Sequence, residues 1–315
     1  KIRRLATTRR FAAYTLPGVE AGLEAIRRMM QAGLKPAVVR LYDSLDTLLA
    51  GGRNKLVEGE SKHLQPPPPP PAPRSRLGTL GTRLGRRLVN LGLHWSRELN
   101  TLAALAPAGC HLVLMHEGEE ELVAAQAQLC AEYCREQKGK ELGPGPAEAW
   151  YAHRYSVSFK QSRVYHAGAF VDTMEVAATW ERLAPLYRAV RAAIGQHALV
   201  LAHFSHAYSE GCSIYFTFVG RAQEAGAEEG YLSLWREALQ ATAEQGATIS
   251  HHHGVGELKA EFMLREVGPA GRQVFDALKQ TIDPSGGMNP GKLWPHTVKT
   301  GGGATAEGRR QGDSA

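Results

Sequence analysis

Apolar and polar positions along this chain follow two periods, a period of two that is typical of strands and a period near 3.6 that is typical of amphipathic helices. Residues 9–16 are mostly apolar and end at a Pro-Gly pair, so they predict a strand. Residues 19–33 place Val, Leu, Ile and Met at helical spacing and end in a glycine, which is common directly after a helix. Residues 35–43 predict a second strand, and the chain therefore opens as strand, helix, strand.

The same two periods recur through most of the remaining sequence. Residues 197–208 and 212–220 are strand-like runs separated by Ser-Glu-Gly, which predicts a hairpin. No nucleotide-binding GxGxxG or GxxxxGK[ST] motif is present. The pattern predicts an α+β fold, an antiparallel sheet with ferredoxin-like elements and helices packed on one face. The other predicted strands are residues 110–115 and 168–176, and the other predicted helices are residues 119–137, 178–195, 228–246 and 271–283.

Residues 51–85 interrupt this order. They contain the proline run Pro66–Pro71 between segments rich in glycine and arginine. A proline run adopts polyproline II at best and cannot enter a packed core, so we predict a flexible surface insertion. A docking site for a proline-recognising partner is the alternative. The polar, glycine-rich tail at residues 301–315 is predicted to be disordered.

The composition is that of an ordinary globular chain, with 315 residues of which 43% are hydrophobic and 22% are charged. The net charge is +6, and residues 1–100 hold 18 Lys and Arg against 7 Asp and Glu. This excess is interpreted either as a solvated basic linker or as attraction for an anionic ligand or surface. No base-reading module is recognisable, so no nucleic-acid partner is expected. No run of about 18 apolar residues predicts a membrane span.

The four cysteines, Cys110, Cys130, Cys134 and Cys212, form no CxxC motif. Cys130 and Cys134 lie four positions apart on one helical face, where small buried side chains are the ordinary interpretation. A disulfide framework is not expected, and a reducing compartment fits this pattern. The N-terminus lacks an initiator Met and the apolar region of a signal peptide, so we expect the chain to start inside a longer gene product.

Three adjacent histidines in "TISHHHGVGELK", Thr248 to Lys259, are the most unusual local feature. A solvated loop, a metal site and the wall of an active site are the competing interpretations. Neighbouring side chains on an extended segment point to opposite faces, so at most His251 and His253 are expected to share a ligand. Gly254 and Gly256 permit close approach of the backbone to a flat ligand.

A second polar cluster, His203, His206, Glu210 and Tyr215, surrounds the predicted hairpin. His203 and Tyr215 face the same side if the two strands pair. A zinc site using His203, His206 and one histidine of the triple is conceivable, but no acidic ligand stands at a motif-like spacing. We therefore expect no metal, and ordinary polar residues at strand ends are the alternative.

Arg40 follows an apolar strand run in "VVRLYD". It can pair with Asp43 or Asp46, or its planar guanidinium can hold a phosphate or carboxylate. Alone, this feature does not separate the two roles.

Five segments occur in the order found in one family: "RLYD", "FVDTMEVAATW", "CSIYFTF", "SHHHGVGELK" and "DPSGGMNPGKLWP". Together they resemble the alkylglycerone-phosphate (alkyl-dihydroxyacetonephosphate) synthases, FAD-linked oxidases of the vanillyl-alcohol-oxidase type. The resemblance spans residues 1–295 apart from the proline insertion. It implies a cap, or substrate, domain and a C-terminal segment that returns to a flavin domain. The FAD-binding domain has no counterpart here, so we expect FAD to be held mainly by that domain, normally in the same polypeptide.

The resemblance implies the following layout of the chain. The start of the cap domain occupies residues 1–50, the insertion residues 51–85, the cap domain residues 86–282, the returning segment residues 283–300 and the tail residues 301–315.

By resemblance, the activity is exchange of the acyl group of acyl-dihydroxyacetone phosphate for a fatty alcohol on a flavin, in ether-lipid synthesis. Tyr215 matches an acid–base tyrosine, and Arg40 matches a functionally required arginine. Gln161 stands where the family has an arginine, although Lys160 and Arg163 are close by. The predicted catalytic residues are Tyr215, His251, His252 and His253; the predicted substrate-binding residues are Arg40, Lys160, Arg163, His203 and His206; the predicted cofactor-binding residues are His252, His253, Gly254, Gly256, Asn289 and Lys292.

Two alternative functions stay open. The Gln161 departure favours a FAD-linked oxidase or dehydrogenase of a 2-hydroxyacid or related small substrate, and a truncated, non-catalytic fragment is the other alternative. The expected partners are the FAD-binding domain, a lipid-like or small acidic substrate and a second copy in a homodimer. The expected compartment is the cytoplasm, or the peroxisome in a eukaryote.

Overall fold

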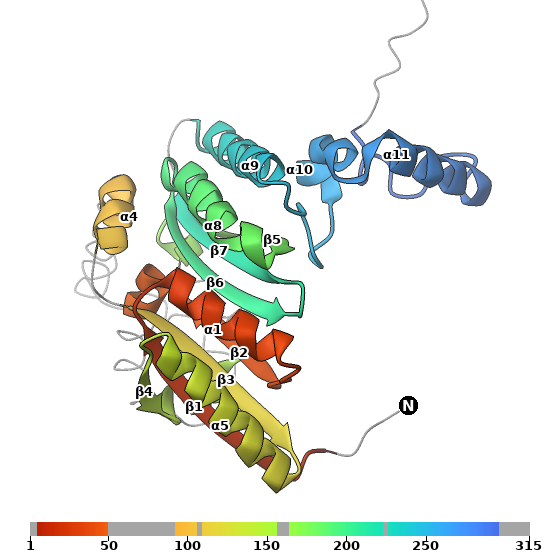
Figure 1. The fold of residues 1–315 in the computed structure, drawn as a ribbon. Helices are drawn as coiled ribbons and strands as arrows, with labels where there is room; N and C mark the ends of the chain where they lie inside the picture. The colour runs from red at the N-terminus through yellow and green to blue at the C-terminus, as the bar shows by residue number, and fades with distance from the viewer. Residues whose placement is uncertain (1–4, 50–91, 106–108, 156–163, 223–225, 296–315) are drawn as a thin grey trace, which may run out of the picture. The chain divides into compact units, whose positions relative to one another are not determined.

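A computed structural model describes residues 5–49, 92–105, 109–155, 164–222 and 226–295 (Figure 1). The chain divides into two compact units, Lys1–Gly254 and Val255–Ala315. This division falls inside the segment 86–282 that the sequence treats as one domain. The predicted insertion and the predicted tail lie outside the described residues.

The first unit is built on one seven-stranded sheet in the order β4-β1-β3-β2-β6-β7-β5. Every strand pair in it is antiparallel. The order β4-β1-β3-β2 is that of a ferredoxin-like unit, and β6, β7 and β5 extend it. The predicted α+β class is therefore confirmed. The strands are β1 (Thr8–Leu16), β2 (Val38–Tyr42), β3 (Cys110–Gly118), β4 (Lys140–Gly143), β5 (Ala169–Thr179), β6 (Leu199–Ala207) and β7 (Gly211–Arg221).

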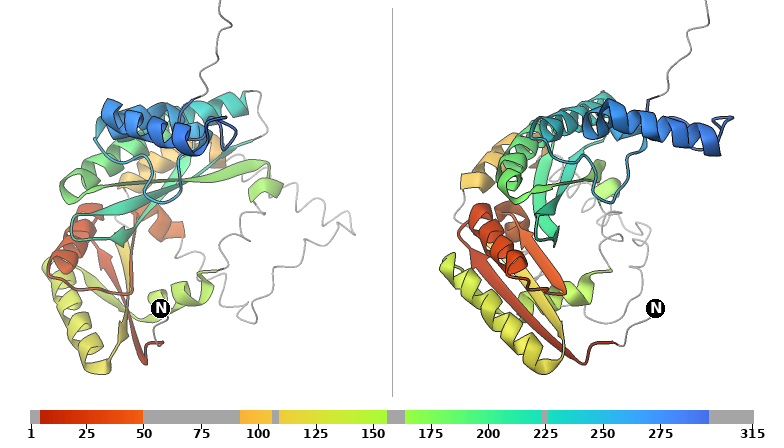
Figure 2. Two further views of the ribbon diagram at one scale, coloured as in Figure 1. Left: turned by 90° about the vertical axis from the view of Figure 1, so that its right-hand side faces the viewer. Right: turned by 45° about the vertical axis from the view of Figure 1, so that its right-hand side comes forward.

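Four helices cover one face of this sheet, as Figures 1 and 2 show. Alternate strand residues point toward them, and Phe204, Phe216 and Phe218 on this face are fully buried. The packing is close: a Cβ added at Gly22 would lie 2.6 Å from the Leu41 methyl groups. The helices are α1 (Val19–Gln31), α5 (Glu120–Glu136), α8 (Trp180–Gly195) and α9 (Ala227–Glu244).

The opposite face is covered over β1 and β3 by α6 (Gly145–His153). Ala147 of this helix packs against Ala13 and Val113, and Phe11 and Tyr42 border the same cluster. The predicted arrangement of helices on one face therefore holds for the four long helices, and α6 adds a short helix on the other face. Farther along, that face of β6, β7 and β5 bears polar side chains.

Among the named elements of the first unit, the sequence pattern missed β4, α6 and α4 (Ser96–Leu105). The edge strand β4 reads Lys-Glu-Leu-Gly and is largely exposed, so it has no apolar alternation to detect. α4 is held by long-range contacts instead of a strong apolar stripe, because the Asn100 amide bonds the carbonyls of Gly195 and Ala198 and the N–H of Val200.

A buried carboxylate joins the end of β2 to α8. Asp43 is fully buried and accepts hydrogen bonds from Arg191 at 2.7 Å, Tyr187 at 3.1 Å and the backbone N–H of Asp46 at 2.8 Å. Several charge-assisted bonds offset the desolvation of a buried ion. Asp43 is thereby paired with Arg191, which was not among the interpretations that the sequence left open for this carboxylate.

The second unit begins with α10 (Gly256–Lys259) and a 3₁₀ turn (Ala260–Phe262), followed by α11 (Met263–Ile282). α11 is interrupted at Gly268, which has a φ of 69° and is followed by Pro269. The part of α11 after this break matches the predicted helix 271–283. The Asp283 carboxylate caps the following loop by accepting the N–H groups of Gly287 and Met288. Among the described helices, none is long and apolar enough to cross a membrane.

Gly211 begins β7 where β5 and β7 are closest. A Cβ there would lie 2.1 Å from the Ala178 carbonyl oxygen, which cannot move without breaking the strand pair. We expect Gly211→Ala to lower the free energy of unfolding by about 1–3 kcal/mol, as overpacking does. The matched control is Gly230→Ala in α9, where nothing lies within 4 Å, and a gain of about 0.5–1 kcal/mol is expected there. Equal effects at both sites in denaturant unfolding would contradict the assigned register.

Candidate active site

The polar face of the sheet carries one continuous row of side chains across four strands. In the strand register, Glu175 of β5 is opposite Tyr215 of β7, Tyr215 is opposite His203 of β6, and His203 is opposite Tyr42 of β2. Residues directly opposite in antiparallel strands share a face and touch. The predicted hairpin and the shared face of His203 and Tyr215 are therefore confirmed.

Tyr215 and His203 form the centre of the row. Their rings are stacked with centroids 4.8 Å apart and planes inclined by 7°. Arg40 Nη2 donates to His203 Nε2 at 2.6 Å. Because a guanidinium has no acceptor, His203 must carry its proton on Nδ1, which faces the Asp46 carboxylate at 3.9 Å. Burial, with the charge of Arg40, lowers the pKa of His203 well below its ordinary value, so the ring stays neutral.

Arg40 is packed against two aromatic rings. Its guanidinium lies 5.4 Å from the Tyr42 ring centroid and 5.9 Å from that of Trp150 in α6. Its buried Nε has no hydrogen-bond partner among the described residues. The hydrogen bond of Arg40 goes to His203 Nε2. A cation fixed by aromatic rings with an unused donor suits a phosphate or carboxylate oxygen.

A bulge in β6 brings His206 into the site. The pairing of β6 and β7 shifts between Ser205 and Ala207, and His206 between them has a φ of 52°. Bulges re-aim side chains in this way. The Tyr215 hydroxyl consequently lies 3.1 Å from His206 Nδ1 and 2.7 Å from His252 Nε2.

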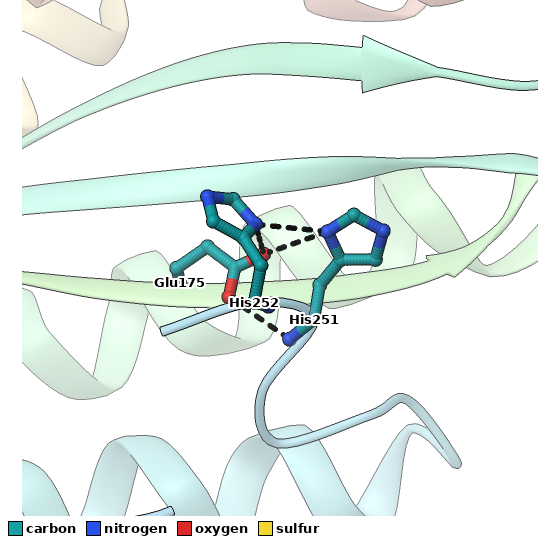
Figure 3. Close-up of side chains that lie close together, drawn as sticks. All are labelled: Glu175, His251 and His252. Carbon is teal, nitrogen blue, oxygen red and sulfur yellow. Dashed lines mark hydrogen bonds and ion pairs between the residues drawn. The ribbon is translucent and has the colours of Figure 1, made fainter. Parts of the chain in front are cut away.

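The histidine loop is held on the sheet by a carboxylate that the sequence analysis did not select. Glu175 is fully buried, and its Oε2 accepts the backbone N–H of His251 at 2.9 Å and of His252 at 3.1 Å (Figure 3). Its Oε1 lies 3.4 Å from His251 Nδ1 and 3.2 Å from His252 Nδ1. The available signal was a glutamate between the apolar residues Met174 and Val176 of a predicted strand.

The arrangement of the three histidines differs from the one expected for an extended segment. His251 Nδ1 and His252 Nδ1 are 2.9 Å apart, so these neighbours converge on one point. The expectation that at most His251 and His253 share a ligand is wrong, because the loop turns over Glu175 instead of running straight. The His253 ring packs edge-on to Tyr215 with centroids 5.5 Å apart.

Burial and hydrogen bonding set the protonation of this cluster. Burial acts to raise the pKa of Glu175, but the backbone N–H groups of His252 and His251 outweigh it and the pKa is lowered. Burial, together with the charge of Glu175, raises the pKa of Tyr215 to about 12. Burial and the neighbouring His252 and His251 lower the pKa of His206. A carboxylate, a protonated phenol and a neutral imidazole therefore stand in contact, which suits proton transfer.

The remaining predicted site residues are not part of this cluster as described. Lys160 and Arg163 lie outside the described residues. Gly256, Asn289 and Lys292 belong to the second compact unit, where Lys292 pairs with Glu257. Gly254 ends the first unit with a φ of 82° and open space at its Cβ position. The structure thus unites seven of the predicted residues: Arg40, His203, His206, Tyr215, His251, His252 and His253.

Comparison with known proteins identifies relatives along nearly the whole chain. A family model described as FAD linked oxidases, C-terminal domain, matches residues 5–293. The alkyldihydroxyacetonephosphate synthase of Trypanosoma brucei brucei is 22% identical over 302 residues, covering 94% of this chain and 45% of that protein. An uncharacterized FAD-linked oxidoreductase of Escherichia coli O157:H7 is 23% identical over 301 residues, covering 90% of this chain and 51% of that protein.

Solved structures give the same relationship. A structure of alkyldihydroxyacetonephosphate synthase aligns with a TM-score of 0.61 at 18% identity, covering 92% of this chain and 46% of that chain. The chain spans about half the length of the curated relatives it matches.

Removal of the Glu175 charge is expected to loosen the histidine loop. Hydrogen bonds to a charged acceptor contribute about 1.5–3 kcal/mol, so Glu175→Gln should speed amide hydrogen exchange at residues 250–253 by at least tenfold. The measurement is hydrogen–deuterium exchange with mass spectrometry. The exposed Glu229→Gln in α9 serves as control and should leave these amides unchanged. Unaltered protection in the Glu175 variant would show that the loop does not depend on this carboxylate.

Proposed function

Since the chain belongs to the C-terminal domain family of the FAD-linked oxidases, we propose that it forms the substrate side of a flavoenzyme active site. The observation that carries this proposal is the Tyr215 hydroxyl, which lies between two imidazoles on the polar face of the sheet. Arg40 stands on the same face, linked to Tyr215 through the His203 ring. This arrangement combines a proton-transferring group with an anion-binding group.

The residues present fit the edge of a flavin. The His251 and His252 side chains are partly exposed, and Gly254 offers open space in a left-handed conformation that favours glycine. We assign His252, His253 and Gly254 to the face that approaches the ring. Bound FAD would supply the centre that exchanges electrons or bonds with the substrate, and the greater part of it would be held by a domain outside this sequence.

The proton chemistry of the site follows from its hydrogen bonds. Tyr215, with its raised pKa, holds its proton and shares it with His252 Nε2 or His206 Nδ1. When either imidazole takes that proton, the phenolate oxygen becomes a base for a C–H or O–H of the substrate. When the proton returns, Tyr215 acts as an acid toward a leaving oxygen. Arg40, which is half-buried, holds an anionic group of the substrate through its guanidinium.

The specific reaction we propose is the one named in the synthase relatives, with acyl-dihydroxyacetone phosphate and a fatty alcohol as substrates. The substrate phosphate suits Arg40. Loss of the acyl group as a fatty-acid carboxylate and entry of the alcohol require removal of the alcohol O–H proton. We assign that proton to His253, whose ring packs against Tyr215, and to His251, whose ring packs against His252.

A second candidate is a FAD-linked dehydrogenase of a small acidic substrate. The E. coli oxidoreductase is as similar to this chain as the synthase is, which favours neither reaction. The same groups serve an acidic substrate: Arg40 holds its carboxylate, and His252 with Tyr215 accepts its hydroxyl proton.

Replacement of the phenol tests the shared proton step. In the complete protein that includes the FAD domain, Tyr215→Phe should lower kcat by about 10²–10⁴-fold while the visible flavin spectrum is unchanged. Tyr231→Phe is the matched control, because the Tyr231 hydroxyl bonds Asp172 on the helix-covered side of β5. Its kcat should stay within a few-fold of the wild-type value. A Tyr215 variant with wild-type turnover would sink the assignment.

The two reactions are separated by their products. Incorporation of a labelled fatty alcohol into an ether product supports the synthase reaction. Anaerobic bleaching of the flavin by one member of a hydroxyacid panel, without ether product, supports the dehydrogenase. If a flavin-loaded protein gives neither the ether product nor flavin bleaching, both reactions are contradicted.

A further inference from the structure

Three donor atoms of Glu175, His251 and His252 converge on one point above β5 (Figure 3). Glu175 Oε1 is 3.4 Å from His251 Nδ1 and 3.2 Å from His252 Nδ1, and the two Nδ1 atoms are 2.9 Å apart. We propose that these three atoms bind a zinc ion. Zinc bonds to nitrogen and oxygen are about 2.0–2.2 Å long, and an ion at that distance from all three fits just above a triangle of this size.

The carboxylate is oriented for this role before any ion arrives. Its Oε2 is fixed by the backbone N–H groups of His251 and His252, which turns Oε1 toward the two rings. Glu175 is fully buried, yet Oε1 has no hydrogen-bond partner among the described residues. Both Nδ1 atoms are within ion-pair distance of Oε1, but neither is aimed well enough to form a hydrogen bond with it. The two Nδ1 atoms contact each other at 2.9 Å, and the buried Oε1 atom is left as an oxygen that a cation would satisfy.

The ligand types also match zinc chemistry. Two histidines and one glutamate are a common zinc ligand set that leaves a fourth position open. The side chains of His251 and His252 are 28% and 40% exposed, so an ion can enter from solvent. His252 Nε2 bonds the Tyr215 hydroxyl at 2.7 Å, which supplies the outer partner that zinc-bound histidines usually have.

The sequence led us to expect no metal because no acidic ligand stood at a motif-like spacing. Glu175 lies 76 positions before His251, and the bridge between Ala177 and Thr248 places the loop beside β5. The structure therefore supplies the missing acidic ligand from a distant strand.

Zinc binding has a consequence that rests on the proposed function. An ion on His252 Nδ1 leaves the ring proton on Nε2, where it faces the Tyr215 hydroxyl. His252 then donates to Tyr215 and cannot accept its proton. Occupancy by zinc and proton uptake by His252 exclude one another, so the ion would leave His206 as the acceptor of the Tyr215 proton and reversibly lower the part of turnover that passes through His252.

The test of zinc binding needs neither flavin nor substrate. The tag-free complete protein is titrated with Zn²⁺ in competition with a chromophoric chelator, and one ion per chain with a Kd of about a micromolar or below is expected. His251→Gln and His252→Gln should each weaken binding at least tenfold. The matched control is His253→Gln, the adjacent histidine outside the triangle, which should stay within about twofold. An anomalous-scattering peak between the three donor atoms in a zinc-soaked crystal would support the site directly.

Two results would overturn the proposal. One is that the complete protein binds no stoichiometric Zn²⁺ although hydrogen exchange shows that its histidine loop is folded. The other is equal weakening by all three histidine variants, which would indicate adventitious binding to exposed imidazoles. Because Tyr215→Phe turnover is measured separately, failure of zinc binding and failure of the proposed flavoenzyme chemistry are distinguishable.

Discussion

The arrangement of the site depends on one buried carboxylate. Glu175 is surrounded by sheet and loop, and a buried charge is tolerated only when hydrogen bonds replace its water. The N–H groups of His251 and His252 supply these bonds, so the loop is drawn onto the sheet at the place where Tyr215 stands in the next strand. The contact of His252 with the Tyr215 hydroxyl follows from that attachment.

This arrangement is possible because one face of the sheet is apolar and covered by helices and the other bears the polar row. On one face, four helices bury the aromatic side chains of β6 and β7, which fixes the strand register because a slip of one residue would turn those rings to the other side. The same register then lines up Glu175, Tyr215 and His203 on the opposite face. Core packing on the apolar face thus decides the geometry of the polar one.

Within the polar row, the tautomers are linked. Arg40 requires a lone pair on His203 Nε2, which keeps that ring neutral and stacked under Tyr215. The Tyr215 hydroxyl in turn touches imidazoles from a bulge of β6 and from the histidine loop. His252 therefore faces the phenol with one ring nitrogen and the Glu175 carboxylate with the other. A proton or a metal ion at either nitrogen changes what the other can do, and this coupling connects the proposed acid–base chemistry with the proposed zinc site.

The sequence by itself determined the long elements, the α+β class, the hairpin and most of the residues that meet in the site, because apolar periodicity and rare residue clusters are local signals. It did not reveal β4 or α6, whose short polar or weakly patterned sequences are held by neighbours, and it left the partner of Arg40 open. Glu175 was visible only as one of two acids in the predicted strand. Its role was decided by tertiary structure alone, because the pairing of β5 with β7 and a loop 76 residues away bring its oxygens to the histidines. Sequence spacing carries no information about contacts that strand register and loop closure create, and in this protein those contacts determine the chemistry.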